Sequence, residues 1–202
     1  GIEKLLLPKG FEISIYADEL ILPRQISESE SGYVFVGSKT GKSDNGKIIA
    51  LIDNNDDGYA EEKIIVAEGL DFPTGVSINN GDLYFSEINK IWTIRDIESW
   101  IDSKSLDLPK KELVTDNLPS DTWHGYKYID FGPDNNIYVS IGAPCNVCTE
   151  PQKKDNRLGA IHRYRNGELI TIAEGVRNSV GFDWSPKNKK LYFTDNGRDW
   201  LG

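Results

Sequence analysis

The residue best placed for acid–base chemistry is one of only two histidines in the chain. His124 lies between Trp123 and Gly125, ahead of a short apolar run, in the stretch DTWHGYKYIDFGPDNNIYVSIGAPCNVC (residues 121–148). Imidazole is the side chain that most readily exchanges a proton near neutral pH. His124 is therefore a candidate general base, and the competing interpretation is a structural histidine bonded to a neighbouring carbonyl. His162, in GAIHRYRNGE, lies among charged residues, and we expect it on the surface.

Two cysteines close the same stretch as a C-x-x-C pair, Cys145 and Cys148. Thr149 stands where a haem-attachment motif needs histidine, and no second ligand pair indicates zinc. A redox dithiol would be expected at a helix start in a βαβ unit, which is missing here. We therefore expect a disulfide that closes a local loop in an oxidising compartment, with free thiols as the alternative.

A third set of candidate ligands lies in the acidic stretch DNNDDGYAEE, residues 53–62. It begins with a D-x-N-x-D-G spacing that resembles an EF-hand loop, in which Gly58 allows the turn. The usual twelfth-position glutamate is absent, because Ile64 stands there. The ligands expected for a structural calcium ion are Asp53, Asn55, Asp57, the backbone carbonyl of Tyr59, and Glu61 or Glu62. The alternative is a solvated acidic turn.

An internal repeat indicates which elements position these residues. An apolar trio with an aromatic residue recurs about every 50 residues, each time after a turn-rich segment such as NNGD or GPDNN. The four trios are YVF at 33–35, LYF at 83–85, IYV at 137–139 and LYF at 191–193. Each unit therefore contains several short strands, and only residues 95–105 are expected to be helical.

Four short strands in each repeat predict an all-β fold of the β-propeller type, with a β-sandwich as the alternative. The expected blades are about 20–68, 69–118, 119–175 and an incomplete fourth at 176–202. Because propellers close with about four to eight blades, the 202 residues cover about three and a half blades of a larger ring. The remaining blades would come from residues absent here or from another chain. Residues 10–20, GFEISIYADEL, are expected to form an outer strand that closes the ring.

In a propeller the first strand of each blade lines the central channel, so the starts of successive first strands meet at the axis. These starts are Pro23–Gln25, Pro73–Gly75, Trp123–Gly125 and Arg177–Ser179. His124, Arg177 and Asn178 are therefore expected around one axial pocket, with the cysteine-bearing loop above them. The acidic stretch joins the third and fourth strands of the first blade, so we expect it on the opposite face.

The charge of the chain restricts its partners. With 23 basic and 32 acidic residues, the net charge is −9. This argues against nucleic acid or an anionic membrane surface, each of which needs a basic patch. No stretch approaches the roughly 20 apolar residues of a membrane span. The chain has no methionine, and we expect that it begins after processing or trimming.

Three stretches carry a family resemblance: SDTWHGYKYIDFGPDNNIYVSIGAPCNVC, GVRNSVGFDWSP and LYFTDNGRDWLG. They resemble the glucose/sorbosone dehydrogenase family of quinoproteins, and the likeness runs from about Leu7 to Gly202. It implies a six-bladed propeller that binds pyrroloquinoline quinone (PQQ) with calcium. The implied reaction is oxidation of a sugar or other alcohol by hydride transfer to the quinone. A separate electron acceptor, such as a cytochrome or quinone, and a periplasmic or secreted location are also implied.

The resemblance also assigns roles to individual residues. His124 matches the catalytic base, and Arg177 and Asn178 match a pair that contacts the reactive carbonyl of the quinone. Asn196 matches a cofactor contact, and the backbone carbonyls of Gly197 and Arg198 match ligands of the PQQ-bound calcium. Arg177 would stabilise the negative charge that grows on the quinone oxygen.

The chain departs from the family in three places. Trp123 stands where the soluble glucose enzymes have an acidic residue before the histidine, Thr74 stands where a glutamine is expected, and Arg198 replaces a proline. These departures leave two other functions open. One is a calcium-dependent lactonase, which Arg177 disfavours because a guanidinium would be repelled by a bare divalent cation. The other is a propeller that binds a partner without catalysis.

Overall fold

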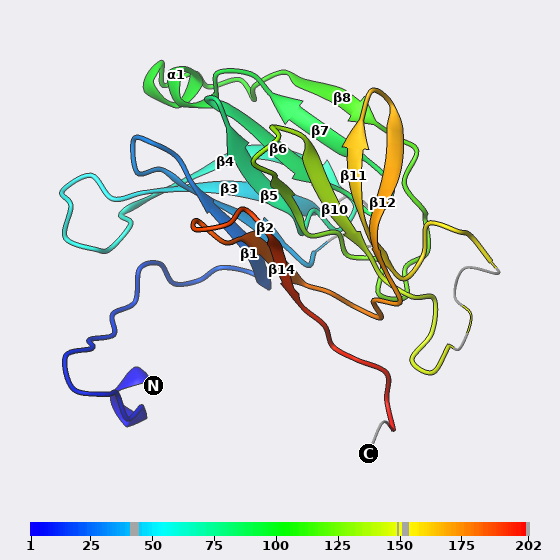
Figure 1. Ribbon diagram of the computed structural model, residues 1–202. Coiled ribbons are helices and arrows are strands. Elements are labelled where there is room, and N and C mark those ends of the chain that lie inside the picture. Colours follow the sequence, from blue (N-terminus) through cyan, green and yellow to red (C-terminus); the bar gives the residue numbers. More distant parts are fainter. Residues whose placement is uncertain (41–44, 149, 151–153, 201–202) are drawn as a thin grey trace.

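The computed structural model of this chain describes residues 1–40, 45–148, 150 and 154–200, and these residues form four antiparallel sheets (Figure 1). The first contains β1 (Pro23–Glu28), β2 (Val34–Ser38), β3 (Gly46–Ile52) and β4 (Glu62–Leu70). The second contains β5 (Val76–Asn79), β6 (Asp82–Ser86), β7 (Ile91–Ile94) and β8 (Lys111–Thr115). The third contains β9 (Ile129–Phe131), β10 (Ile137–Ile141), β11 (Ala160–Arg165) and β12 (Glu168–Glu174). The fourth contains β13 (Gly181–Trp184) and β14 (Leu191–Thr194).

This order confirms the predicted fold class. Each sheet is a meander in chain order, and the apolar trios fall at the second strand of each, in β2, β6, β10 and β14. A helix occurs where one was expected, as α1 (Ile97–Asp102), and a short 3-10 turn, η1 (Ile2–Lys4), precedes the first sheet. The chain thus folds as three four-stranded blades and a two-stranded fourth.

The sheets pack face to face through the side chains that alternate along their strands. Phe35 and Val66 of the first sheet share a buried cluster with Phe85 of the second. Ile91 of the second sheet joins Val139 of the third. Between the third and fourth sheets the contact is aromatic, and the rings of Tyr128 and Phe182 meet edge to face with centroids 4.8 Å apart. Such edge-to-face pairs contribute beyond the area that they bury.

Hydrogen bonds join the first strands of the blades where they lie closest together. The Gln25 side chain of β1 donates from Nε2 to the Ile129 carbonyl of β9 (2.7 Å) and accepts from the Ile129 N–H (3.2 Å). Its backbone N–H donates to the Thr74 carbonyl just before β5 (3.3 Å). A Cβ at Gly75 would lie only 2.5 Å from the Lys127 carbonyl. The first three blades are therefore fastened together near the axis at a separation that only glycine permits there.

The N-terminal segment does not form the outer strand expected for residues 10–20. The structure has no strand in residues 5–22, and Figure 1 shows this segment running out from the sheets. It is attached instead by packing of Tyr16 and Leu20 against the first sheet and by a bond from the Ala60 N–H to the Tyr16 carbonyl (2.7 Å). The physical reason is that a strand needs a neighbouring strand to satisfy its backbone groups. Within this structure no other strand pairs with the segment.

Candidate functional site

His124 lies in the loop between β8 and β9, and its ring is fixed by one hydrogen bond. Its Nδ1 lies 2.7 Å from the carbonyl oxygen of Ala143. A carbonyl can only accept, so Nδ1 must carry the hydrogen. In the neutral ring Nε2 then keeps the free lone pair, and it has no hydrogen-bond partner among the described residues. This tautomer makes Nε2 the basic atom.

The backbone around His124 explains why glycine follows β10. His124 adopts a left-handed conformation (φ 48°), which non-glycine residues rarely adopt. A Cβ at Gly142 would overlap the Cβ and the carbonyl oxygen of His124. The end of β10 therefore approaches the histidine so closely that only glycine fits between them.

Trp123 does not replace the acidic neighbour that orients the histidine in the resembling family. Its indole is 55% exposed and meets the imidazole edge to face, with ring centroids 5.9 Å apart. The Ala143 carbonyl takes the orienting role, because it fixes both the ring and the tautomer without a second charge.

The guanidinium of Arg177 donates four hydrogen bonds to residues of the same chain, and the side chain is 15% exposed. The acceptors are the Asn146 carbonyl (from Nε, 3.1 Å), Asn146 Oδ1 (from Nη2, 2.7 Å), Asp199 Oδ1 (from Nη2, 3.0 Å) and the Asn196 carbonyl (from Nη1, 2.7 Å). A guanidinium carries five N–H donors. One N–H, on Nη1, therefore has no acceptor among the described residues and can bind an external oxygen.

Ala143 connects the imidazole of His124 with the backbone of Arg177. Its carbonyl accepts from His124, and its N–H donates to the Arg177 carbonyl (2.7 Å). The backbone N–H groups of Arg177 and Asn178 in turn donate to the two oxygens of Asp195 (3.2 and 2.8 Å). His124 and Arg177, which are far apart in sequence, thus both bond to Ala143.

Three more of the predicted residues follow β14 and leave backbone oxygens available. Asn196 donates from its backbone N–H and from Nδ2 to the Asn178 carbonyl (3.2 and 3.3 Å). The carbonyls of Gly197 and Arg198 accept no hydrogen bond from the described residues. Such oxygens are the ligands that calcium prefers. The carboxamide of Asn178 likewise makes no bond within the described chain.

A cavity of about 440 Å³ lies along the first strands, in the size range of small-molecule sites. Its lining residues are Pro23, Arg24, Gln25, Ile26, Thr74, Tyr126, Lys127, Tyr128 and Val180. They come from the first strands of the four sheets or from the residues just before them, but the predicted starts Trp123–Gly125 and Arg177–Ser179 do not line this cavity. His124 and Arg177 are not among the lining residues. The Thr74 hydroxyl donates to the Lys127 carbonyl (3.2 Å), so it already has a partner between blades.

Lys127 is an unusual residue that the sequence analysis missed. It is 2% exposed, and its Nζ donates to the Gly125 carbonyl, one residue after His124. No carboxylate of the described residues forms an ion pair with it. Burial lowers the pKa of Lys127 to about 7, although the charge of Asp121 acts to raise it. The available signal was a lysine at an alternate position of YKYID, on the same side of the strand as the buried Ile129.

The acidic stretch forms a compact loop between β3 and β4. Carboxylate oxygens of Asp53, Asp57 and Glu61 all lie within 4.8 Å of one another. Desolvation acts to raise the pKa of Asp53, but the backbone N–H groups of the loop, above all that of Gly58 (2.8 Å), hold it below its usual value. Glu62 begins β4 and lines a different cavity, so geometry favours Glu61 as the closing ligand.

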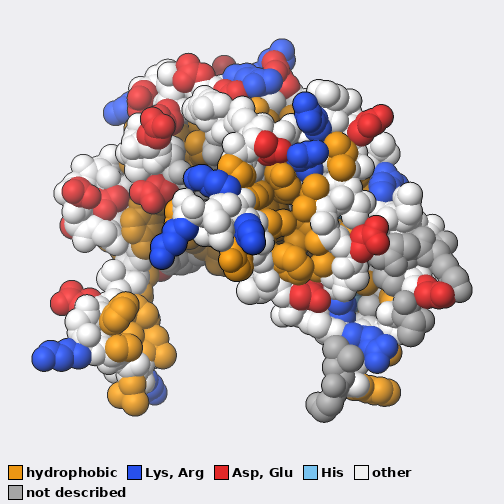
Figure 2. Space-filling model, viewed as in Figure 1, with side chains coloured by type: hydrophobic (Ala, Val, Ile, Leu, Met, Phe, Trp, Pro, Cys, Tyr) orange, Lys and Arg blue, Asp and Glu red, His pale blue; other side chains and the backbone are white. Residues whose placement is uncertain are grey.

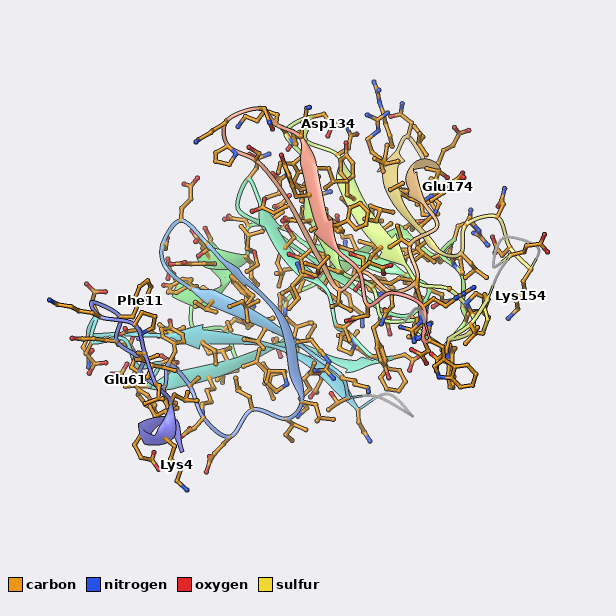
Figure 3. The ribbon with its side chains drawn as sticks, turned by 60° about the horizontal axis from the view of Figure 1, so that its bottom comes forward. Lys4, Phe11, Glu61, Asp134, Lys154 and Glu174 are labelled. Carbon is orange, nitrogen blue, oxygen red and sulfur yellow. A yellow bond between two sulfur atoms is a disulfide. The ribbon has the colours of Figure 1, made fainter. Side chains whose placement is uncertain are left out.

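This loop is far from His124. Figure 3 shows Glu61 at one side of the molecule and Lys154, which bonds to Asp121 of the His124 loop, at the other. The calcium site predicted for the acidic loop is therefore separate from the candidate active site, as expected.

The remaining two predictions had different outcomes. Cys145 and Cys148 are bonded as a disulfide, with Cα atoms 5.5 Å apart. The expectation that His162 lies on the surface is wrong, because this side chain in β11 is 1% exposed. Its Nε2 lies 2.8 Å from the Arg157 carbonyl and its Nδ1 lies 3.2 Å from the Thr171 hydroxyl. Burial lowers the pKa of His162. The charged neighbours in its sequence point away, and the segment before β11 covers it.

The sheets and their converging first strands define a β-propeller. The chain belongs to the family described as a domain of unknown function (DUF7133), whose model matches residues 1–200. An uncharacterized protein of Borreliella burgdorferi is 32% identical over 207 residues, which cover 98% of this chain and 51% of that protein. This chain therefore spans about half the length of that relative.

Solved structures with low sequence identity share the fold. A Trichoderma reesei member of Carbohydrate-Active Enzymes Family AA12 matches with a TM-score of 0.79 and 20% identity, over 98% of this chain and 51% of that one. The pyranose dehydrogenase PQQ domain of Coprinopsis cinerea, in its holo form, matches with a TM-score of 0.70 and 16% identity, over 90% and 45%. A gluconolactonase of Xanthomonas campestris matches with a TM-score of 0.55 and 12% identity, over 86% and 54%.

Proposed function

We propose that this chain is part of a PQQ-dependent dehydrogenase that oxidises a sugar or another alcohol, with His124 as its base. The observation that supports this most directly is the bond between His124 Nδ1 and the Ala143 carbonyl, which leaves Nε2 as the proton acceptor. A substrate hydroxyl within hydrogen-bond reach of Nε2 would lose its proton to the imidazole as the carbinol carbon is oxidised.

The donor set around Arg177 is compatible with the cofactor. The Nη1 N–H of Arg177 that has no acceptor in the described part of the chain can donate one bond to an oxygen that gains negative charge. The free carboxamide of Asn178 can add a second polar contact. The carbonyls of Gly197 and Arg198 would hold calcium, and Asn196 would contact the cofactor. When bound, PQQ would supply a two-electron acceptor for hydride, and calcium would polarise and orient it.

The proposal includes the setting of the enzyme. A sugar or small alcohol would be the substrate, and a separate cytochrome or quinone would take the electrons. The disulfide supports a periplasmic or secreted location, where such bonds persist. Among the described residues, no helix is long and apolar enough to cross a membrane.

The test uses the full natural chain, reconstituted with PQQ and calcium and supplied with aldoses or simple alcohols and a dye acceptor. We expect dye reduction that falls by at least about 10²-fold in His124→Ala, the lower end of what a general base contributes. The matched control is His162→Gln, which changes the other histidine and should keep the turnover per folded molecule.

Other outcomes separate the alternatives. Hydrolysis of a sugar lactone with calcium but without PQQ would support the lactonase instead. Absence of both activities in a folded protein would favour a binding module and contradict the proposal. Dye reduction that is unchanged in His124→Ala would contradict the assignment of the base.

A further inference from the structure

We propose that Asn146 is the positioning residue of Arg177, and that the Cys145–Cys148 disulfide keeps Asn146 in place. The inference deepens the proposed function, because it concerns the arginine that would contact the cofactor. It rests on contacts within the chain, so it can be tested separately from catalysis.

Asn146 provides two of the four acceptors that surround the guanidinium. Its backbone carbonyl accepts from Nε (3.1 Å) and its Oδ1 accepts from Nη2 (2.7 Å). Two acceptors on one residue bind one edge of the planar group and so fix its plane. The other two acceptors, on Asn196 and Asp199, come from the segment after β14. Together these acceptors occupy every guanidinium N–H except one on Nη1, counted over the residues that the structure describes.

Asn146 lies inside the small loop that the disulfide closes. Cys145 and Cys148 are three positions apart, and their bond encloses Asn146 and Val147. The segment between β10 and β11 is long and has no strand among its described residues. A cross-link in such a loop reduces the number of conformations that the loop can adopt. Less conformational entropy is then lost when the two Asn146 oxygens are placed beside Arg177. The disulfide therefore restricts the backbone of this loop, as the hydrogen bonds of regular secondary structure would.

The same loop also supports His124. Ala143, two residues before Cys145, accepts from the imidazole and donates to the Arg177 carbonyl. Residues 143–148 thus hold the ring of one candidate catalytic residue and both the backbone and the side chain of the other. Preorganised donors are effective because they need no rearrangement when charge develops.

The first measurement does not depend on activity. In ¹⁵N-labelled full natural chain without cofactor, the Arg177 Nη2–H signal, assigned by its loss in Arg177→Lys, should exchange slowly with solvent, because Nη2 donates to Asn146 Oδ1. Asn146→Leu has a similar shape but lacks Oδ1, and we expect exchange about tenfold faster or more. Asn146→Asp keeps an acceptor and should restore slow exchange. Val147→Ala, in the same disulfide loop but without a bond to Arg177, is the matched control.

The second measurement tests the consequence for function. In the reconstituted protein, Asn146→Leu should lower kcat by roughly 10- to 100-fold, as expected for a misplaced catalytic group, with a smaller change in cofactor affinity. Cys145→Ser/Cys148→Ser should act in the same direction on both exchange and kcat. Asn146→Asp should recover most of the turnover.

The two proposals fail differently. Slow exchange that survives in both Asn146→Leu and the double serine variant would overturn the positioning role, whatever the activity. If the Leu variant does not fold, Asn146→Ala removes the same acceptor and is judged by the same signal. Fast exchange in these variants together with no dye reduction in the unmodified protein would support the positioning role and contradict the proposed function.

Discussion

At the scale of single residues, Lys127 is a buried lysine that has no carboxylate partner among the described residues. It is nearly completely buried, its Nζ has a carbonyl partner, and burial lowers its pKa to about 7. In the unfolded chain a lysine keeps its proton up to a pH of about 10.4. Between these two values the unfolded state binds more protons than the folded state, so the free energy of unfolding should rise with pH.

Replacing the charge should remove this dependence. We expect Lys127→Met to stabilise the protein below about pH 7, where the native lysine is protonated at a cost of up to about 4–5 kcal/mol, before the lost Gly125 bond is subtracted. The gain should shrink as the pH rises towards 10. Urea unfolding at pH 6 and pH 9 measures it. A change in stability that is equal at both pH values would contradict the lowered pKa of Lys127, because the contribution of a shifted pKa must vary with pH.

Other features of the site follow from contacts that no local pattern encodes. The loop position of His124 and the Cys145–Cys148 disulfide were both predicted, because each depends on residues only a few positions apart in the sequence. The acceptors of Arg177 were not, since Asn146 lies 31 positions away and Asp199 lies 22 positions away. His162 was misassigned for the same reason: its neighbours in sequence are charged, but the segment that buries it is brought there by tertiary folding.

At the scale of elements, the repeat in the sequence predicts most of the strands and their order in the sheets. The trios at β2, β6, β10 and β14 combine β-propensity with a preceding turn signal. Each trio therefore predicts one strand from the local sequence alone. The expected strand at residues 10–20 has the same alternation, with Phe11, Ile13 and Ile15 on one side, yet these side chains are exposed. Alternation specifies a face, but a strand forms only beside a partner.

The loop between β3 and β4 should respond to calcium in a way that distinguishes a metal site from an acidic turn. We expect calcium to stabilise the protein by about 2.7 kcal/mol at a concentration 100-fold above the dissociation constant, seen as a higher Tm than in chelator. Asp53→Asn should remove most of this gain. Glu62→Gln is the matched control, because Glu62 lies next to the cluster in sequence but outside it in space.

The two interpretations of the loop differ in the response to calcium. If the loop is a solvated turn, calcium has no effect, and Asp53→Asn changes stability equally in calcium and in chelator. Equal Tm values in calcium and in chelator would therefore contradict the calcium site.

At the scale of the whole molecule, apolar side chains are exposed at both ends of the row of blades. Ile26 of β1 is 65% exposed, and Tyr192 of β14 is 60% exposed. Figure 2 shows hydrophobic side chains gathered in the middle of one face. Inner sheets of the same row bury the corresponding positions, such as Val76 and Tyr138. We infer that further blades, from residues beyond this sequence or from another chain, cover these ends, in line with a relative about twice as long.

The 202-residue chain produced alone should then associate through its exposed last sheet. Tyr192→Ser should weaken that association by about 1–2 kcal/mol, or roughly 5- to 30-fold in the dissociation constant, because this side chain is still 60% exposed in the chain alone. Leu106→Ser is the control, since Leu106 is fully exposed but lies on a loop outside the sheets. Light scattering across a dilution series gives the constants. If the chain stays monomeric at all concentrations and binds no hydrophobic dye, its exposed end faces do not drive association. This result would contradict the inference that further blades cover these ends.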